Sequence, residues 1–273
     1  MSYSPMELAE VFIKTGELDD ALEALNQQLQ NEPRDEKARR LRASVLSRFD
    51  DPTHLENALH DLQQIASQTR EDYIQQSVIY ARLEKPEDAI RVMHTAHQQL
   101  PDDERILERL VDLMTDAGQY DAVIELLKLA PQTWRWLMRQ ADAYALNNHP
   151  DDALSALNQA QQHLLTIFPD LLSPVSRNSM ARIHVARGQV HMTLNNLDAA
   201  ESDFKDALYH IPDDITITFN LGLIYALKDN MSKAKRYCQK ALDNTSDYVR
   251  QTLIDVLNQD SRYDALKAEL KLD

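Results

Sequence analysis

The chain is short of the residues on which sheets, disulfides and membrane spans depend. Its 273 residues include only 4 glycines and one cysteine, and 6% are aromatic. Glycine-rich turns and β-branched runs are scarce, which favours helix over sheet. The single cysteine, Cys238, cannot form an intramolecular disulfide and suits a reducing compartment, so we expect it to pack in the core.

Long hydrophobic runs are missing too. The longest apolar stretches, such as residues 123–130, are interrupted by charge and too short to cross a bilayer. The first residues, MSYSPMELAEVF, show no basic segment followed by an apolar one, as a signal peptide would. The sequence therefore predicts a cytoplasmic protein without membrane insertion.

Positive charge is also in deficit, because the formal net charge is −15. Phosphate contacts require an excess of Lys and Arg, so we predict no nucleic-acid partner. No glycine-rich phosphate loop, HExxH or CxxC occurs, and no nucleophile has a base and an orienting group beside it. His94 and His97 lack a third ligand, and His184 and His191 stand at packing positions. We therefore expect no enzyme activity, cofactor or metal.

What the chain does contain is a repeat of 34 residues. Gly188, Ala200 and Ala207 recur as Gly222, Ala234 and Ala241, and Phe204 recurs as Cys238. This period is typical of a helix–turn–helix unit whose two helices cross where the small residues lie. The second-helix alanine can be followed along the chain at Ala21, Ala58, Ala89, Ala122 and Ala153. Prolines stop helices at the ends of units, at Pro33, Pro101 and Pro212.

These positions resemble the tetratricopeptide repeat (TPR) consensus, for example Gly222, Tyr225, Ala234, Cys238 and Ala241 in the last full repeat. The resemblance implies an all-α protein, a single right-handed α-solenoid over residues 1–273. The repeats are expected at 2–35, 36–69, 70–102, 103–133, 134–167, 181–214 and 215–248, with a capping segment at 249–273. The second repeat has a lengthened turn, and the fourth is short. Pro169 and Pro174 predict a loop at 168–180, a possible seam.

In this family the first helix of each repeat lines a concave surface through positions 2, 5, 6, 9, 12 and 13. The resemblance therefore implies a partner-binding groove for an extended or helical peptide with acidic and apolar residues. The alternative is that its arginines pair with neighbouring acids. Asn220 matches one of five positions of the family's chaperone clamp, so we predict no such clamp. The groove residues are Lys37, Arg40, Arg48, Arg82, Met114, Arg135, Met138, Arg139, Arg182, Met192, Phe219 and Asn220.

The predicted function is a non-enzymatic scaffold or adaptor that binds a protein or peptide. A structural subunit of a larger assembly, using the convex face or the termini, is the alternative. A peptide-sensing regulator of DNA binding would need a helix–turn–helix module where repeat 2–35 already lies. Two interpretations of the apolar residues in the C-terminal segment remain. Leu253, Val256, Leu257 and Leu266 either pair with a second copy of the chain or cover the apolar face of the last repeat.

Overall fold

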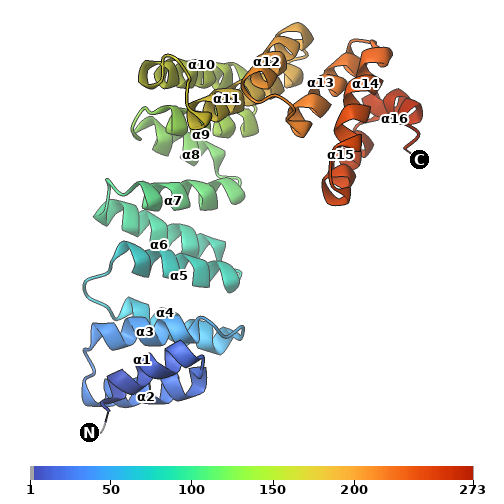
Figure 1. Ribbon diagram of the computed structural model, residues 1–273. Coiled ribbons are helices and arrows are strands. Elements are labelled where there is room, and N and C mark those ends of the chain that lie inside the picture. Colours follow the sequence, from blue (N-terminus) through green and yellow to red (C-terminus); the bar gives the residue numbers. More distant parts are fainter. Residues whose placement is uncertain (1–2, 273) are drawn as a thin grey trace. The chain divides into compact units, whose positions relative to one another are not determined.

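The computed structural model describes residues 3–272, and within this range every regular element is a helix (Figure 1). This confirms the predicted all-α class. No helix in the described range is long and apolar enough to cross a membrane. The first eight helices are α1 (Pro5–Thr15), α2 (Leu18–Asn31), α3 (Glu36–Leu46), α4 (Pro52–Gln63), α5 (Arg70–Arg82), α6 (Pro86–Gln99), α7 (Glu104–Asp116) and α8 (Tyr120–Lys128). The others are α9 (Trp134–Leu146), α10 (Pro150–Ile167), α11 (Pro174–Thr193), α12 (Leu197–His210), α13 (Ile215–Leu227), α14 (Met231–Asp243), α15 (Asp247–Gln259), η1 (Ser261–Tyr263) and α16 (Asp264–Leu270).

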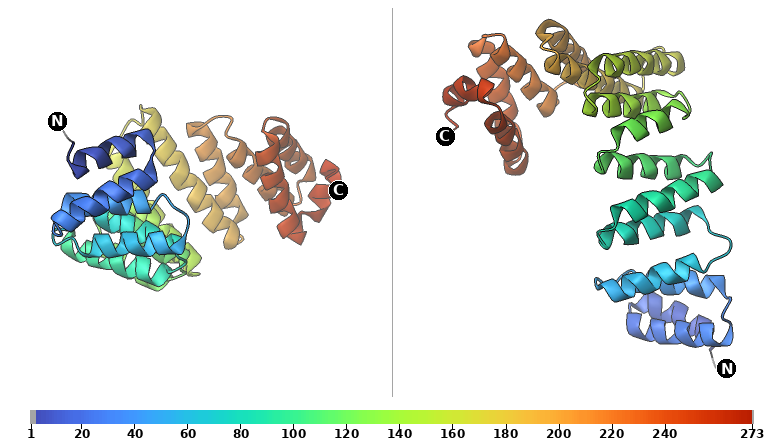
Figure 2. Two further views of the ribbon diagram at one scale, coloured as in Figure 1. Left: turned by 90° about the horizontal axis from the view of Figure 1, so that it is seen from below. Right: turned by 180° about the vertical axis from the view of Figure 1, so that it is seen from behind.

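Each predicted repeat corresponds to two consecutive helices, an odd-numbered first helix and an even-numbered second one. Within each compact unit described below, the two helices of a pair lie side by side in antiparallel fashion, which both views of Figure 2 show for α11 with α12 and for α13 with α14. Second helices also contact the first helix of the next pair, as α2 contacts α3 and α12 contacts α13. Neighbouring pairs therefore bury each other's apolar faces, as repeat proteins require.

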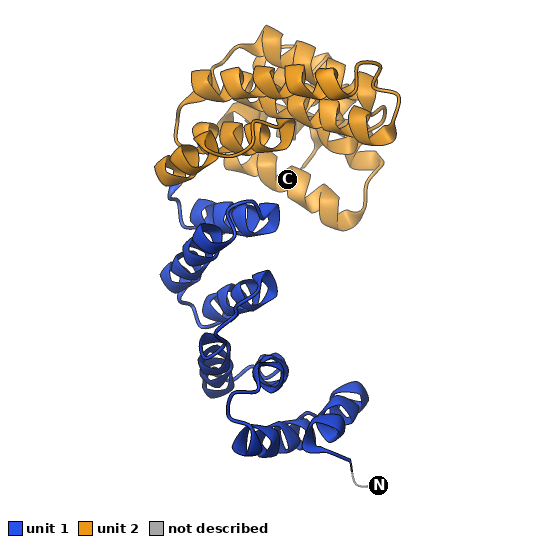
Figure 3. Cartoon of the chain, turned by 90° about the vertical axis from the view of Figure 1, so that its left-hand side faces the viewer, with its two compact units in different colours: residues 1–119 blue, residues 120–273 orange. Residues whose placement is uncertain are grey.

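The helices gather into two compact units, residues 1–119 and 120–273, coloured separately in Figure 3. The division falls between α7 and α8, inside the fourth predicted repeat. The possible seam predicted from the sequence lies at 168–180 instead. In that region α10 contacts α11 directly, within the second unit.

The predicted loop at 168–180 is shorter than expected. Pro174 is the first residue of α11, and the Ser173 side chain accepts a hydrogen bond from the Ser176 backbone N–H at 3.0 Å. Proline is favoured at the first helical position because the missing N–H would have no partner there. Pro174 therefore begins a helix that it was expected to interrupt, and only residues 168–173 connect α10 to α11.

Tight turns join the two helices of a pair, and most place one residue in the left-handed region. Gly16 and Gly118 have φ values of 86° and 70°. Asn148, Asn195 and Asp229 occupy the same conformation in later pairs, with φ between 56° and 59°. Glycine accepts this conformation without steric cost, and Asn and Asp tolerate it better than other residues.

Small residues allow the close helix crossings that the repeat pattern predicts. A Cβ added at Gly188 would lie 3.0–3.2 Å from ring atoms of Phe204. At Gly222 it would collide with Cys238 Sγ and lie 3.0 Å from the Cys238 backbone nitrogen. Cys238 is fully buried, as expected, and burial raises the pKa of its thiol to about 12.

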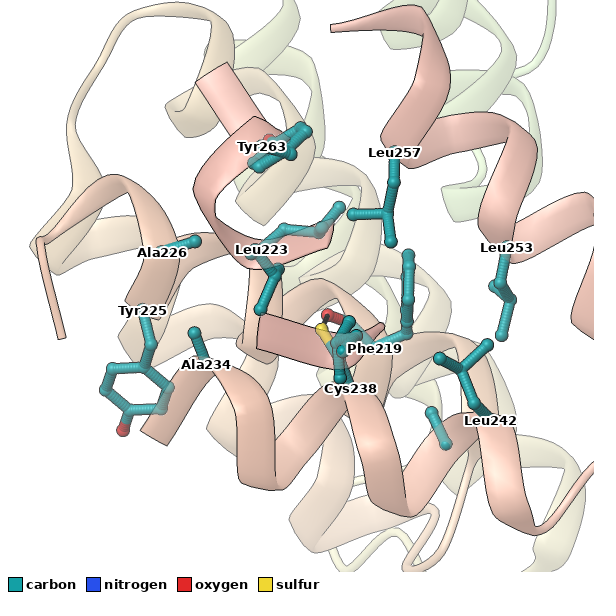
Figure 4. Packing of buried hydrophobic residues seen from close by; sticks show 13 residues of the cluster. Phe219, Leu223, Tyr225, Ala226, Ala234, Cys238, Leu242, Leu253, Leu257 and Tyr263 are labelled. Atoms are coloured by element: carbon teal, nitrogen blue, oxygen red, sulfur yellow. Dashed lines mark hydrogen bonds between the residues drawn. The ribbon is translucent and has the colours of Figure 1, made fainter. Parts of the chain in front are cut away.

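The C-terminal segment packs on the last repeat. Leu253, Leu257 and Leu266 are buried in one cluster with Phe219 and Cys238 (Figure 4). Of the four apolar residues considered for self-association, Val256 alone is exposed. These contacts support the reading of residues 249–272 as a cap and leave little apolar surface there for a second copy.

Substituting Gly222→Ala is expected to destabilise the protein by about 1–3 kcal/mol, because a methyl group has no room between α13 and α14. Gly188→Ala should cost less, since only the outer ring atoms of Phe204 are near and the ring can tilt. Urea unfolding followed by circular dichroism measures both. Adding Cys238→Ala should restore only part of the stability lost in Gly222→Ala, because the backbone atoms of α14 would still lie close to the new methyl group. Unchanged unfolding of both glycine variants would contradict the crossing geometry.

Candidate partner-binding groove

In the first unit, three of the predicted groove cations are held by groups of the same chain. Lys37 Nζ lies 2.7 Å from Glu10 Oε1, which joins α3 to α1. Arg40 donates from Nε to both oxygens of buried Asp72 at 3.0 Å, and from Nη2 to the Ser67 carbonyl. Arg82 donates to the carbonyls of Ser47 and Phe49 and to Asp50. These contacts favour the alternative in which the arginines serve the fold.

Two further predicted residues of this unit differ in their exposure. Arg48 is exposed, and within residues 3–272 its side chain makes no ion pair or hydrogen bond. Met114 is only 2% exposed, so its side chain packs in the interior and offers nothing to a partner. The first unit therefore presents a single unengaged cation of the predicted set.

In the second unit, the predicted cations lie on α9 and α11. Arg135 and Arg182 are exposed and occupy the same repeat position, near the start of α9 and near the middle of α11, and Arg139 lies one turn after Arg135. The Arg135 guanidinium stacks 5.5 Å from the centre of the Trp134 ring. The helices α9 and α11 are neighbours. The predicted cations of this unit therefore lie on two neighbouring helices.

The predicted apolar residues of this unit are mostly buried. Phe219 is 1% exposed and Met138 is 8% exposed, whereas Met192 and Asn220 are half-buried. Phe219 packs in the cluster of the cap, and Met192 packs against the hydrophobic clusters on both of its sides. The expectation that Met114, Met138 and Phe219 face a partner is thus corrected, because helix packing covers these side chains.

A pocket lies in the furrow between α9 and α11, with α10 at its base. Its volume is about 290 Å³. Four of its lining residues, Asp142, Ala145, Ala186 and Gln189, stand at groove positions of their repeats, as does Thr193. The full lining is Ala141, Asp142, Ala145, Asn148, Pro150, Leu157, Ala186, Gln189, Val190, Thr193 and Leu194. We call this pocket, together with Arg135, Arg139 and Arg182, the α9–α11 groove.

Asp142 is the single charged residue that lines the pocket. The surrounding protein displaces water and raises the pKa of its carboxyl group, while the charges of Arg139 and Arg182 act in the opposite direction. Two cations thus lie close enough to influence one carboxylate. With Arg135 nearby on α9, the groove carries an excess of positive charge in a chain whose net charge is −15.

The residues that form this pocket were not among the predicted groove residues. Ala145 and Ala186 are small, and Gln189 and Thr193 are uncharged, so none stood out among arginines and methionines. The signal lay in their size: Met114 and Met192 occupy the position of Ala145 in the repeats before and after. A comparison of side-chain volume at each groove position could have found the pocket.

A second polar group lies between α10, α11 and α12. His184, Asp203 and Asp206 each offer one atom that could bind a metal ion, and these atoms lie within 4.8 Å of one another. Arg187 already donates to both Asp203 oxygens, at 2.6–3.1 Å, and His184 Nδ1 is 3.0 Å from Oδ1. Burial raises the pKa of Asp203, but the hydrogen bonds from His184 and Arg187 bring it below its usual value. A guanidinium therefore satisfies this carboxylate, and the group is an internal ion network.

Comparisons with known proteins agree with this architecture. Two sequence models described as tetratricopeptide repeat match residues 80–135 and 180–249. Anaphase-promoting complex subunit CDC16 of Saccharomyces cerevisiae is 32% identical over 107 residues, or 39% of this chain. The match spans only 11% of the length of that relative.

Solved structures share the fold at low sequence identity. The C-terminal part of a TPR repeat-containing protein from Cytophaga hutchinsonii has a TM-score of 0.58 at 13% identity, covering 90% of this chain and 97% of its own. A tetratricopeptide repeat protein from Parabacteroides merdae has a TM-score of 0.52 at 15% identity, with coverage of 93% and 98%. A thermophilic TPR protein from Thermus thermophilus has a TM-score of 0.50 at 21% identity, with coverage of 70% and 100%. The sequence matches identify tetratricopeptide repeats in residues 80–135 and 180–249, and the paired helices and these structures show that the chain has the tetratricopeptide repeat fold.

Proposed function

We propose that this protein is a non-enzymatic adaptor that binds an acidic and apolar peptide segment of a partner protein in the α9–α11 groove. Tetratricopeptide repeats generally mediate protein–protein interactions, and the groove combines a pocket with exposed positive charge. The observation that carries the proposal is the pocket of about 290 Å³ between two first helices, whose Asp142 carboxylate lies close enough to Arg139 and Arg182 to be influenced by their charges. A cytoplasmic location is part of the proposal, and the single, buried cysteine supports it.

The charge of the groove supports an acidic partner. Arginine binds carboxylates through two parallel hydrogen bonds, and Arg135 and Arg182 are exposed to do so. Unlike Arg40 and Arg82, neither forms an ion pair with an acid of the described chain. Because the rest of the surface is acidic, it would repel the same partner and favour docking at the groove.

Reversing the charge of the groove is expected to remove the partner. In affinity purification from the native cell with mass spectrometry, Arg135→Glu/Arg182→Glu should lose a protein that the wild type retains. Both residues are exposed, so circular dichroism should show an unchanged fold. Arg34→Glu/Arg105→Glu is the matched control, because it changes the net charge equally at two exposed positions outside the groove. A partner retained by the groove variant would move the interface to another surface.

A second candidate function is a structural subunit of a larger assembly. It is favoured by the apolar residues exposed around the connection of α10 to α11, where Leu172 is 82% exposed and Val175 is 64% exposed. Leu165, Ile167 and Phe168 add to the same segment. Contiguous exposed apolar surface is typical of interaction sites. In this case Leu172→Asp/Val175→Asp, and not the groove variant, should release partners that co-purify in fixed stoichiometry.

A further inference from the structure

The pocket of the α9–α11 groove exists because two side chains are short. Ala145, on α9, and Ala186, on α11, both line it. At the position of Ala145 the neighbouring repeats carry Met114 and Met192, and at the position of Ala186 the next repeat carries Asn220. A side chain of either size would extend into the pocket. The space is therefore a property of this pair of repeats.

The lining of the pocket suits an uncharged side chain. Seven of its eleven residues are apolar, namely Ala141, Ala145, Pro150, Leu157, Ala186, Val190 and Leu194. Asn148, Gln189 and Thr193 can hydrogen-bond to peptide groups, which is how pockets with few polar residues fix the orientation of a ligand. Asp142 disfavours a second carboxylate within the pocket. An acidic residue of the partner must therefore bind elsewhere in the groove.

Helix geometry sets the distance between the pocket and the nearest exposed cation. Gln189 and Val190 lie at the middle of the part of α11 that lines the pocket, and Arg182 lies two turns earlier. Seven residues of helix correspond to about 10 Å. A peptide in the extended polyproline II conformation covers that distance in about three residues, at roughly 3.1 Å each, and its side chains three residues apart lie on the same face. A segment lying along the furrow would thus meet both features at once.

We propose that the groove recognises an extended segment in which a leucine-sized or larger apolar side chain enters the pocket and an acidic residue about three positions away, in either chain direction, binds Arg182. This inference rests on the proposed function and adds the partner's sequence pattern to it. The apolar residue of the peptide buries surface in the pocket, and the acidic residue fixes the position of the peptide along the groove. Polypeptide segments without this spacing would satisfy one feature and leave the other unused.

The test is selection from a random 12-residue peptide library displayed on phage, against the full-length protein. Enriched peptides are then made with a fluorescent label, and binding is measured by anisotropy. Filling the pocket with Ala145→Met should weaken binding by about 10- to 100-fold, the effect of losing one buried apolar side chain. The fold should persist, because Ala145 is exposed and methionine occurs at the same position in both neighbouring repeats. Ala81→Met, at the equivalent exposed position of the third repeat, is the matched control and should bind as the wild type does.

The outcomes separate the two proposals. The inference is supported if the enriched peptides have the stated spacing and bind more weakly to Ala145→Met and to Arg182→Glu. It also requires that replacing the apolar residue of the peptide by serine causes no further loss of affinity for Ala145→Met. If Arg182→Glu weakens binding but Ala145→Met does not, the pocket inference is overturned and the adaptor proposal stands. If neither variant matters, or no peptide is enriched, both are overturned.

Discussion

Replacing Arg39 and Arg42 together by methionine is expected to lower the free energy of unfolding by about 3–5 kcal/mol. Both guanidinium groups bind Asp61, which belongs to α4 and is 0% exposed. Arg42 donates to its two oxygens at 2.7 and 2.6 Å, and Arg39 donates at 3.3 Å. Without them, a fully buried carboxylate would have no counter-charge and no access to water.

The control for this prediction removes the carboxylate as well. Asp61→Leu in the Arg39→Met/Arg42→Met background should recover most of the lost stability, because an apolar contact between α3 and α4 replaces the ion network. Asp61→Leu alone should cost less than the double arginine substitution, since Arg39 and Arg42 are partly exposed and can turn toward solvent. Urea denaturation of the four proteins gives the complete cycle. Equal losses in all three variants would show that the network acts by packing and not by charge.

Asp203→Asn is expected to cost about 3 kcal/mol at neutral pH, because it removes the charge that Arg187 and His184 hold in the second unit. The hydrogen bonds that lower the pKa of Asp203 below 3.8 prevail over its burial, so the folded state favours the ionised form. A carboxyl group whose folded pKa is depressed contributes stability above its unfolded pKa and loses that contribution as pH falls through the folded value.

The difference in the free energy of unfolding between wild type and Asp203→Asn should therefore be constant above about pH 5 and shrink below about pH 4. Thermal unfolding at several pH values from about 3 to neutrality measures this difference. Arg187→Gln serves as the companion variant, because it removes the cation and leaves the buried acid. A difference that does not change with pH would mean that the new amide disturbs packing and that the charge of Asp203 matters little.

The repeat architecture was predictable because its signals are local. Gly188 and Gly222 report a helix crossing within one repeat, and their alanine partners fix the register of the second helix. Pro174 was misread because the same residue ends one helix and begins another, and the difference depends on the cap that Ser173 provides. The fold class and the helix pairs thus followed from sequence, and the start of α11 did not.

The site was less predictable. The sequence of one repeat defines which residues stand at groove positions, but side chains of the adjacent repeats decide whether those residues are exposed or engaged. The position of Arg40 on α3 is evident from the sequence. That it binds Asp72 depends on how α5 lies against α3, and nothing within one repeat encodes that arrangement. Met138 and Phe219 stand at groove positions, yet adjacent helices cover them. An empty pocket is harder still to predict, because it depends on what several side chains leave unfilled.

The isolation of Cys238 has a practical consequence. It is the sole thiol of the chain and lies against Gly222 where α14 crosses α13. A thiol reagent can reach it only when these two helices separate, so its labelling rate in native buffer measures how often the last repeat opens. Repeat arrays lose structure one unit at a time more readily than compact domains do. Comparing that rate with global unfolding would show whether the C-terminal cap holds the end of the array closed.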